Sequence, residues 1–391
     1  MRIGIDTTSW TNRRGFGRFV RELVGALASL GNDDEYVLLA DRQTAERVNF
    51  PDNCRVLIGD TSVAAAEAAA ANGRRSLADM LTMRQLAKRV PLDLVFFPAV
   101  YSYFPVGGNV PCIVTFHDVI AETLPHLIFE SARSRIFWRL KCRLALHRSS
   151  CAITVSQASK QGLMNVFGLN SSRVHVVSEA PSEVFRPVDS ATDAHRRVLE
   201  RYGIRPDDRF FLYVGGISPH KNIQTLIRAF AQLKAEPGPS TRLVIVGDYA
   251  GDVFRTCYTS LVEEARTLGA SDDLLFTGFV PDEELVHLYA STEAFVFPSY
   301  LEGFGLPVVE AMACGAPVIA SDRGSLPEVL DGAGHLFDPH DVEPLAAAMS
   351  QVINDRAYRQ QLVSRSLARA KDFSWEKSAR QAVEIFHRFR P

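Results

Sequence analysis

The chain has 391 residues, 47% hydrophobic and 23% charged, with a formal net charge of −2. This composition is typical of a folded globular protein of two or three domains, and it excludes a disordered tail, a collagen-like repeat and a small disulfide scaffold. The near-zero charge gives no nucleic-acid signature, and no apolar run is long enough to span a membrane.

The N-terminus and the cysteines favour a cytoplasmic protein. Asp6 stands where a signal peptide needs its apolar stretch. The six cysteines form no C-x-x-C pair and no Cys/His metal spacing, so reduced, mostly buried thiols are expected, and no metal site. Basic residues outnumber acidic ones in residues 1–180, and the reverse holds in 181–391. This asymmetry favours two domains that face different partners.

Short apolar strands alternate with helical segments along the whole chain, which predicts an α/β protein with two parallel sheets. The strand pattern lapses from about Glu183 to Asp208. We therefore expect an N-terminal domain at 1–185, a C-terminal domain at 186–373 and an amphipathic helix at 374–391. Strands are expected at Arg2–Asp6, Tyr36–Ala40, Leu94–Phe97, Cys112–Phe116, Ala152–Val155, Phe210–Val214, Leu243–Val246, Leu274–Thr277, Ala294–Phe297 and Pro317–Ala320.

The first candidate segment is Phe297–Met312, where a strand ends, a glycine-bearing turn follows and a helix begins near Leu306. Exposed amides at such a helix N-terminus attract anions. Glu310 lies among apolar residues, and its carboxylate needs hydrogen-bond donors there, which sugar hydroxyls can supply. The alternative is a first-turn glutamate stabilised by the helix dipole. Glu302, in the turn, has a similar alternative.

The second candidate segment is Tyr213–Asn222. A strand ends at Gly215 and Gly216, and Lys221 is expected at the start of the next helix. A lysine in this place suits a diphosphate and stabilises charge on a leaving group. The alternative is a solvated surface lysine.

Two weaker segments complete the set. Arg13–Arg18 follows the first strand, and its Gly15 and Gly17 let backbone amides approach a phosphate, with a helix expected from Gly17. It is not a P-loop, because no G-K-[ST] follows, and it is not a G-x-G-x-x-G fingerprint, because Val20 occupies the third glycine position. His117 follows another strand, where open α/β sheets bind ligands, although a lone histidine is more often structural.

Together these four segments resemble the retaining glycosyltransferases of family four. The resemblance covers most of the chain, and its motifs are densest from Phe210 to Val329. Glu302 and Glu310 form the Glu-x₇-Glu pair of that family. The opening Gly-Ile-Asp and the Phe-His-Asp around His117 resemble a subgroup rich in bacterial mannosyltransferases of O-antigen and exopolysaccharide assembly. The resemblance implies the GT-B fold, with two Rossmann-like domains facing across a cleft and a C-terminal helix that could cross back to the N-terminal domain.

The resemblance also implies roles for the candidate residues. Glu302 would hold hydroxyls of the donor sugar, Glu310 the ribose hydroxyls and Lys221 the diphosphate. His117 would contact the sugar near its reacting carbon, so the catalytic set would be His117, Glu302 and Lys221. No metal or other cofactor is implied, because the nucleotide-sugar is itself a substrate. The donor-binding set would be Gly15, Gly17, Gly216, Lys221, Glu302, Gly303, Phe304, Gly305, Leu306 and Glu310.

One departure from the family pattern concerns the diphosphate. Family members commonly supply a second cation, an arginine directly after the strand glycine or directly before the lysine. Here these positions are Gly216 and His220. His220 itself, or Arg14, Arg18 or Arg323, could take that part.

The expected function is transfer of a sugar, foremost mannose from GDP-mannose, to a glycan or lipid-linked saccharide in surface polysaccharide synthesis. A UDP-sugar or another GDP-sugar donor stays open, as do another GT-B enzyme such as an epimerase and a non-catalytic sugar-nucleotide-binding protein. A nicotinamide dehydrogenase is disfavoured by the missing fingerprint. No nucleic-acid partner is expected. Candidates for the acceptor side are Trp10, Tyr101, Tyr103, His126 and Phe129.

The run Arg133–Arg148 carries six Lys and Arg residues and no acid, interleaved with large apolar residues. One interpretation is a half-buried helix with a solvated basic face. The other is docking on an anionic leaflet, which a lipid-linked acceptor would make useful. The second interpretation gives a cytoplasmic protein that is peripheral at the inner face of a membrane.

Overall fold

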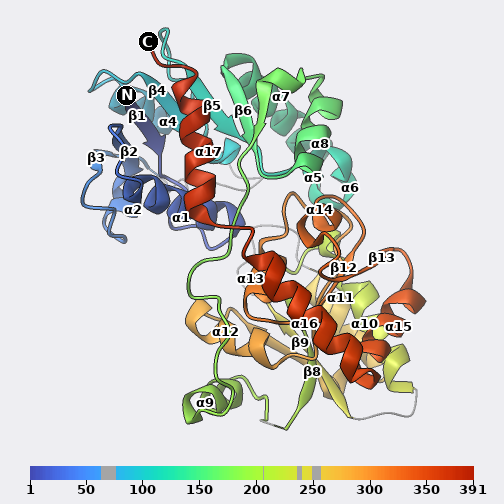
Figure 1. Cartoon of the computed structure of the whole chain (residues 1–391). Helices are drawn as coiled ribbons and strands as arrows, with labels where there is room; N and C mark the ends of the chain where they lie inside the picture. Colours follow the sequence, from blue (N-terminus) through green and yellow to red (C-terminus); the bar gives the residue numbers. More distant parts are fainter. Residues whose placement is uncertain (63–75, 206, 236–239, 249–256) are drawn as a thin grey trace. The chain divides into compact units, whose positions relative to one another are not determined.

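The computed structural model describes residues 1–62, 76–205, 207–235, 240–248 and 257–391. The chain divides into two compact units (Figure 1). Unit 1 comprises Met1–Glu179 and Ser374–Pro391, and unit 2 comprises Ala180–Phe373. The divisions thus lie at 179/180 and 373/374, where the sequence suggests 185/186 and 373/374. Each unit is an α/β body with its own parallel sheet, as the alternating pattern predicts.

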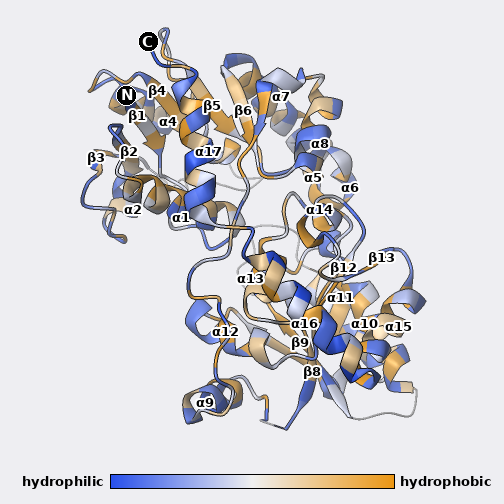
Figure 2. Cartoon of the chain, in the orientation of Figure 1, coloured by the Kyte–Doolittle hydropathy of each residue, from blue (hydrophilic) through white to orange (hydrophobic). Residues whose placement is uncertain are grey.

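Unit 1 contains a seven-stranded sheet in the order β3-β2-β1-β4-β5-β6-β7, with every recorded strand pair parallel. All positions of β4, β5 and β6 are buried, because helices cover both faces of a parallel sheet. Figure 2 accordingly shows β5 and β6 mostly in the hydrophobic colour. The strands are β1 (Arg2–Asp6), β2 (Glu35–Asp41), β3 (Arg55–Gly59), β4 (Leu94–Phe97), β5 (Cys112–Thr115), β6 (Cys151–Thr154) and β7 (Val174–Val176).

The C-terminal helix α17 belongs to unit 1, which confirms that the chain returns to its N-terminal half. Ser374 caps α17, because its hydroxyl accepts a hydrogen bond from the Lys377 amide. The helix packs on α1, and the rings of Phe96 and Phe386 lie 5.1 Å apart. The helices of this unit are α1 (Gly15–Ser29), α2 (Arg42–Ala45), α4 (Leu77–Ala87), α5 (Ile120–Thr123), α6 (Pro125–Ile128), α7 (Ala132–Arg148), α8 (Gln157–Phe167) and α17 (Trp375–His387).

Unit 2 contains a six-stranded parallel sheet in the order β10-β9-β8-β11-β12-β13. Its strands are β8 (Arg209–Val214), β9 (Thr241–Val246), β10 (Leu274–Gly278), β11 (Ala294–Phe297), β12 (Val318–Ser321) and β13 (His335–Phe337). Its helices are α9 (Asp193–Arg201), α10 (Ile223–Ala235), α11 (Tyr258–Thr267), α12 (Asp282–Ser291), α13 (Leu306–Ala313), α14 (Leu326–Leu330), α15 (Val342–Asn354) and α16 (Arg356–Ala370).

The strand order reverses at one place in each sheet. In unit 1 the chain runs outward from β1 to β3 and then returns to place β4 beside β1, and in unit 2 β11 is placed beside β8 in the same way. Open α/β sheets bind ligands outside the carboxyl ends of the strands at such switch points. The segments that follow β1, β4, β8 and β11 are therefore where a ligand is expected.

The ten predicted strands are all present, three of them with the predicted bounds and seven with ends that differ by one or two residues. The sequence misses β3, β7 and β13, which are edge strands of five, three and three residues with half-exposed positions. All six cysteines are free, and four of them are buried, so the expectation of reduced, mostly buried thiols is confirmed.

Candidate active site

The centre of the candidate site in unit 2 is an ion pair between Lys221 and Glu302. Lys221 follows β8 and Glu302 follows β11, the two strands at the switch point. The Lys221 Nζ donates to Glu302 Oε1 at 2.6 Å, and the two side chains are only 18% and 9% exposed. The same Nζ lies 5.5 Å from the centroid of the Phe297 ring. Two residues that lie far apart in the sequence are thus in direct contact, and the surface-lysine interpretation does not fit.

Lys221 ends a short 3-10 turn, Pro219–Lys221, and does not lie in the first turn of α10 as the sequence suggests. The reason is Asn222, which adopts a left-handed backbone conformation (φ 56°) that asparagine tolerates better than most residues. Its buried Nδ2 donates to the carbonyl oxygens of Pro298, at 3.0 Å, and Pro339, at 2.8 Å. Asn222 therefore fastens the lysine turn to the loop that carries Glu302. Sequence analysis missed it.

The loop from Glu302 into α13 is held by Ser325. The Ser325 hydroxyl donates to the carbonyl oxygens of Glu302, at 3.2 Å, and Phe304, at 2.8 Å. Gly305 takes φ +94° at the helix N-cap, and a Cβ there would lie 2.7 Å from Leu326 Cδ2. Only glycine fits this place, which explains the glycine between Phe304 and the helix. Gly303, Phe304, Gly305 and Leu306 are all buried.

Helix α13 presents a bare N-terminus and a buried carboxylate. Its first turn has no acidic residue and no side-chain cap. Pro307 has no N–H and the Val308 amide donates to the Gly305 carbonyl oxygen at 2.8 Å, so the Leu306 amide is the first-turn donor that can meet an anion. Glu310 is the fifth residue of the helix, so the first-turn alternative does not apply. Its side chain is buried, and the Tyr289 hydroxyl donates to Glu310 Oε2 at 3.3 Å. Sequence analysis did not identify Tyr289 as a partner of Glu310.

In unit 1, Gly15 and Gly17 lie in the first turn of α1, which begins two residues earlier than predicted. A Cβ on Gly17 would overlap the carbonyl oxygen of Asn12, so the turn is too tight for any side chain. Gly15 is exposed, and a Cβ there would meet no atom within 4 Å. This first turn also lacks an acidic residue and a side-chain cap. It can therefore present amides closely to an anion.

His117 follows β5 and uses both ring nitrogens within unit 1. Its Nε2 lies 2.9 Å from the Pro98 carbonyl oxygen at the end of β4, and its Nδ1 lies 3.2 Å from Glu179 Oε1. A carbonyl oxygen only accepts hydrogen bonds, so Nε2 is assigned as the donor to Pro98, and Nδ1 is the nitrogen that faces the Glu179 carboxyl group. A hydrogen bond from His117 to a sugar would have to replace one of these two. Glu179, which is buried, was missed by sequence analysis.

The candidates for a second diphosphate cation differ in their surroundings. Arg323 pairs with Asp322 at 3.1 Å and with Asp338 at 2.6 Å, so carboxylates already neutralise it. His220 Nδ1 lies 3.3 Å from the Ser218 hydroxyl. Gly216 is exposed after β8, while Arg14 and Arg18 flank Gly15 and Gly17 at the start of α1.

The acceptor-side candidates fall into two groups. Trp10 and Tyr103 are buried against other rings, with centroids 4.9 Å from Phe50 and 5.1 Å from Phe97, which fits packing. Tyr101 stacks on Phe16 at 5.0 Å, beside the glycine turn. The last two, His126 and Phe129, lie in and directly after α6.

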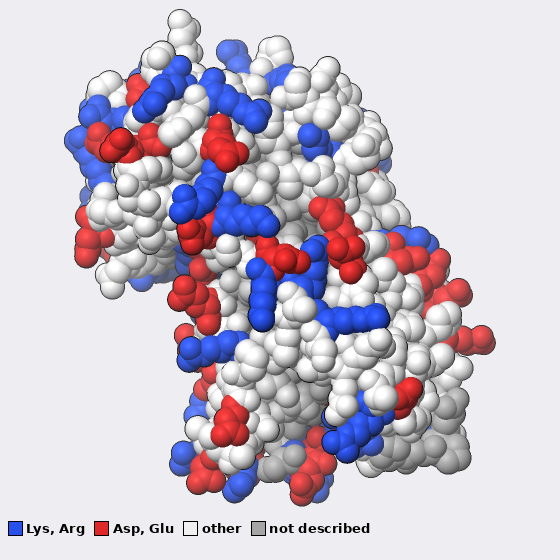
Figure 3. Space-filling model, in the orientation of Figure 1, with Lys and Arg blue, Asp and Glu red and all other residues white. Residues whose placement is uncertain are grey.

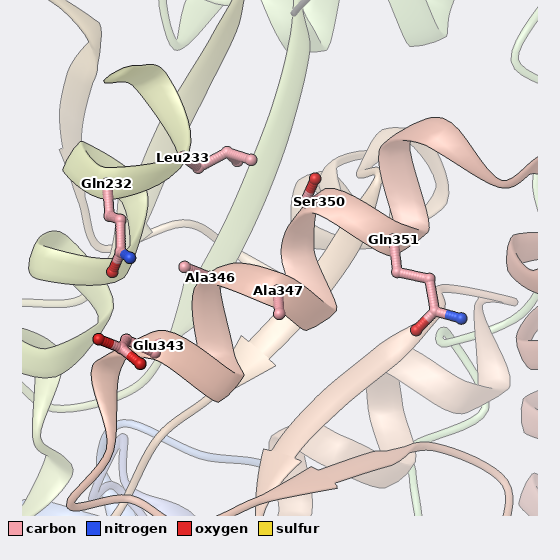
Figure 4. A pocket seen from close by; sticks show the side chains of 7 residues that line it. All are labelled: Gln232, Leu233, Glu343, Ala346, Ala347, Ser350 and Gln351. Carbon is pink, nitrogen blue, oxygen red and sulfur yellow. The ribbon is translucent and has the colours of Figure 1, made fainter. Parts of the chain in front are cut away.

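A depression of about 500 Å³ between α10 and α15 lies on the helical side of unit 2 (Figure 4). It contains none of the predicted site residues, so it belongs to helix packing and not to the switch point. Its lining residues are Gln232, Leu233, Glu343, Ala346, Ala347, Ser350 and Gln351. Within the described residues, no group of three or more His, Cys, Asp or Glu side chains is placed to hold a metal ion. Among the helices of that part of the chain, none is long and apolar enough to cross a membrane.

Comparison with known proteins identifies the class of protein to which this fold belongs. Residues 196–369 match the family "Glycosyl transferases group 1", and residues 13–180 match "Glycosyltransferase Family 4". The O-antigen chain mannosyltransferase B of Escherichia coli is 34% identical over 281 residues, covering 70% of this chain and 69% of that protein. The chain belongs to this glycosyltransferase family and is an enzyme that transfers a sugar.

Other relatives define what the match covers. The serotype-specific mannosyltransferase WbdA of Escherichia coli is 33% identical over 74% of this chain, but the match spans only 35% of WbdA. A D-inositol 3-phosphate glycosyltransferase of Nocardia farcinica is 30% identical over 78% of this chain and 68% of that protein.

Solved structures confirm the GT-B fold. Sucrose-phosphate synthase from Thermosynechococcus elongatus has a TM-score of 0.78 at 20% identity, with 99% of this chain and 98% of that chain covered. Anabaena HepE in complex with UDP has a TM-score of 0.73 at 20% identity and 99% coverage of both chains. At this identity the likeness concerns the fold alone.

Proposed function

We propose that the enzyme transfers mannose from GDP-mannose, with retention of configuration, to a glycan or lipid-linked saccharide of a surface polysaccharide. The relatives named as O-antigen and serotype-specific mannosyltransferases support the sugar and the pathway class. The assignment of guanine as the base of the donor rests on the same resemblance to mannosyltransferases.

The observation that carries this proposal is the Lys221–Glu302 pair. A nucleotide-sugar offers a diphosphate and a set of sugar hydroxyls side by side, so it can replace both halves of the pair. The diphosphate would take Lys221, and the hydroxyls would donate to Glu302. Lys221 would then stabilise the charge that develops on the leaving diphosphate. Loss of such a contact in a dry site typically costs a hundredfold to a thousandfold in kcat.

The rest of the donor would lie along α13. Glu310 is buried with the Tyr289 hydroxyl as its recorded donor, and ribose hydroxyls would supply further ones. The backbone amides of Phe304, Gly305 and Leu306, at the start of α13, would donate to the sugar and the phosphates. Each contact is local to unit 2, so donor binding is expected to depend mainly on this unit.

Unit 1 would complete the reaction from the acceptor side. Gly15 and Gly17 would let the start of α1 approach the phosphates, and His117 would lie near the reacting carbon. In the proposed front-face displacement, the bond from the sugar carbon to the phosphate oxygen breaks as the acceptor oxygen bonds to the same face. The leaving phosphate takes the acceptor proton, so no protein nucleophile is assigned. We also propose a peripheral membrane contact through Arg133–Arg148.

The test is a transfer assay with GDP-mannose and, in parallel, UDP-glucose, using mannose-terminated oligosaccharides as acceptors. The proposal expects GDP release coupled to a mannosylated product, with the α-anomer of the donor retained in its NMR spectrum. Lys221→Met should lower kcat at least a hundredfold, while Lys234→Met, which removes an exposed lysine of α10 paired with Asp273, should not. Transfer from UDP-glucose alone would overturn the donor assignment, and an inverted product would overturn the mechanism.

A further inference from the structure

Helix α7 has two opposite apolar faces. Its inner face consists of Trp138, Cys142, Ala145 and Leu146, which are buried. Four more large apolar side chains are exposed, with exposed fractions of 60% for Ile136, 69% for Phe137, 60% for Leu140 and 45% for Leu144. At about 100° per residue, these four fall within an arc of roughly 100° on the side away from the buried face. We call them the outward stripe.

Basic residues border the outward stripe. Arg135, Arg139 and Arg143 recur every four residues along one edge, and all three are exposed. Arg148, which is exposed, lies toward the other edge, and α7 contains no Asp or Glu. On the face of unit 1 that Figure 3 shows, blue Lys and Arg side chains and red Asp and Glu side chains lie among white atoms. An apolar stripe between basic edges matches the interface of an anionic bilayer, where apolar side chains enter the acyl boundary and cations meet the headgroups.

Two residues of α7, Trp138 on its inner face and Lys141 beside that face, bond to segments that border the candidate site. The Trp138 Nε1 donates to Glu122 Oε1 at 2.7 Å, and Glu122 lies in α5, five residues after His117. The Lys141 Nζ donates to the Tyr101 carbonyl oxygen at 2.8 Å. The Tyr101 ring stacks on Phe16, in the first turn of α1. A surface that binds α7 would therefore lie against the helix that supports the acceptor side of unit 1.

We propose that the outward stripe of α7 docks unit 1 on an anionic lipid surface. This proposal rests on the proposed function, because docking on lipid is useful to an enzyme whose acceptor is a lipid-linked saccharide presented at such a surface. The charge of the edges commits the occupant to anionic lipid and not to a neutral bilayer. Insertion of the apolar side chains and attraction of the basic side chains each contribute to binding, so a substitution that removes either contribution should weaken binding.

The test is flotation of the full chain with phosphatidylglycerol vesicles and with phosphatidylcholine vesicles, at low salt and at 0.5 M salt. The wild type should float with the anionic vesicles only, and less at high salt. Phe137→Glu should weaken binding at least tenfold. The combined Arg135→Gln, Arg139→Gln and Arg143→Gln variant should weaken it roughly a hundredfold, at about fivefold per charge. Leu77→Glu, on α4 of the same unit and 75% exposed, is the matched control and should bind as the wild type does.

Several outcomes would overturn the proposal. The wild type could fail to float at low salt, or Phe137→Glu could bind as well as Leu77→Glu. A dimer in sedimentation that Phe137→Glu dissociates would make the stripe a protein interface instead. Thermal stabilisation by GDP, measured without lipid, separates this proposal from the proposed function. Phe137→Glu should keep that stabilisation, and its absence in the wild type would count against the donor assignment while leaving flotation as the measure of docking.

Discussion

Glu179 Oε1 lies 3.2 Å from His117 Nδ1, and Glu179 is the last residue of unit 1 before the chain enters unit 2. The pair thus joins a predicted catalytic residue to the point where the units divide. Because His117 also donates to the Pro98 carbonyl oxygen, its ring is fixed from two sides. The orientation of His117 is therefore set by two groups that follow other strands of the same sheet.

The first prediction concerns that pair. Glu179→Ala leaves His117 Nδ1 without its acceptor in a buried place, so it should lower the free energy of unfolding by about 1–3 kcal/mol. Glu179→Gln keeps an acceptor oxygen and should cost less than half of that. Urea unfolding of both variants measures the difference. Equal losses for the two would show that side-chain volume, and not the hydrogen bond, is what Glu179 contributes.

The second prediction concerns Asn222. Asn222→Asp keeps a residue that tolerates the left-handed backbone but removes both Nδ2 bonds, to Pro298 and Pro339. Two buried carbonyl oxygens lose their donor, so the loss in unfolding free energy should be about 2–4 kcal/mol. Asn354→Ala is the control, because its amide bonds only the Ser350 hydroxyl on an exposed surface, and it should change stability by less than about 0.5 kcal/mol. Similar values for the two variants would contradict the fastening role.

The third prediction concerns pH. Burial of Glu122 between α5 and α7 raises the pKa of its carboxyl from 4.5 to about 7. Between these values the folded state holds a proton that the unfolded state has released, so Glu122 lowers stability as pH rises from about 4.5 to about 7. Glu122→Gln should keep the Trp138 bond and gain up to about 3 kcal/mol at pH 8 but little at pH 4.5. Urea unfolding at pH 4.5 and at pH 8 measures this gain in unfolding free energy. A gain that is independent of pH would contradict the raised pKa of Glu122 as its cause.

The fourth prediction compares two glycines. Gly305→Ala puts a Cβ at φ +94° and against Leu326, so it should destabilise the protein by about 1–3 kcal/mol. Gly25 lies inside α1 with nothing within 4 Å of a Cβ, so Gly25→Ala should stabilise by about 0.5–1 kcal/mol. Thermal unfolding measures both changes in stability, and a loss for Gly305→Ala with a gain for Gly25→Ala would support the close fit of the loop that carries Glu302. Two changes of the same sign would not.

Sequence patterns predicted the central strands, because strands buried on both faces are continuous apolar runs that stand out, such as Leu94–Phe97. They missed β3, β7 and β13, which lie at sheet edges and share their pattern with loops. The chemically distinctive residues Lys221 and Glu302 were visible in sequence. Their supports, such as Asn222 and Ser325, were not, because an ordinary polar residue gains its role only when the fold brings a partner to it.

Helix α7 shows a different limit. Its run of basic residues was plain in the sequence. Its apolar residues lie on two opposite faces, so the helical periodicity of the sequence does not indicate a single apolar face. The sequence therefore did not separate Trp138, which packs inward, from Phe137, which is exposed. Only the packing of unit 1 distinguishes them.

The central claim is that Lys221 and Glu302 hold a nucleotide-sugar. The most direct measurement is thermal unfolding of the wild type, Glu302→Gln and the control Lys234→Met with GDP, UDP, GDP-mannose and UDP-glucose. A ligand at a hundred times its dissociation constant adds about 2.7 kcal/mol of stability. The account predicts that GDP-mannose stabilises the wild type and Lys234→Met, and that Glu302→Gln loses the gain of GDP-mannose over GDP. Stabilisation by no nucleotide, or an equal gain in Glu302→Gln, would contradict it.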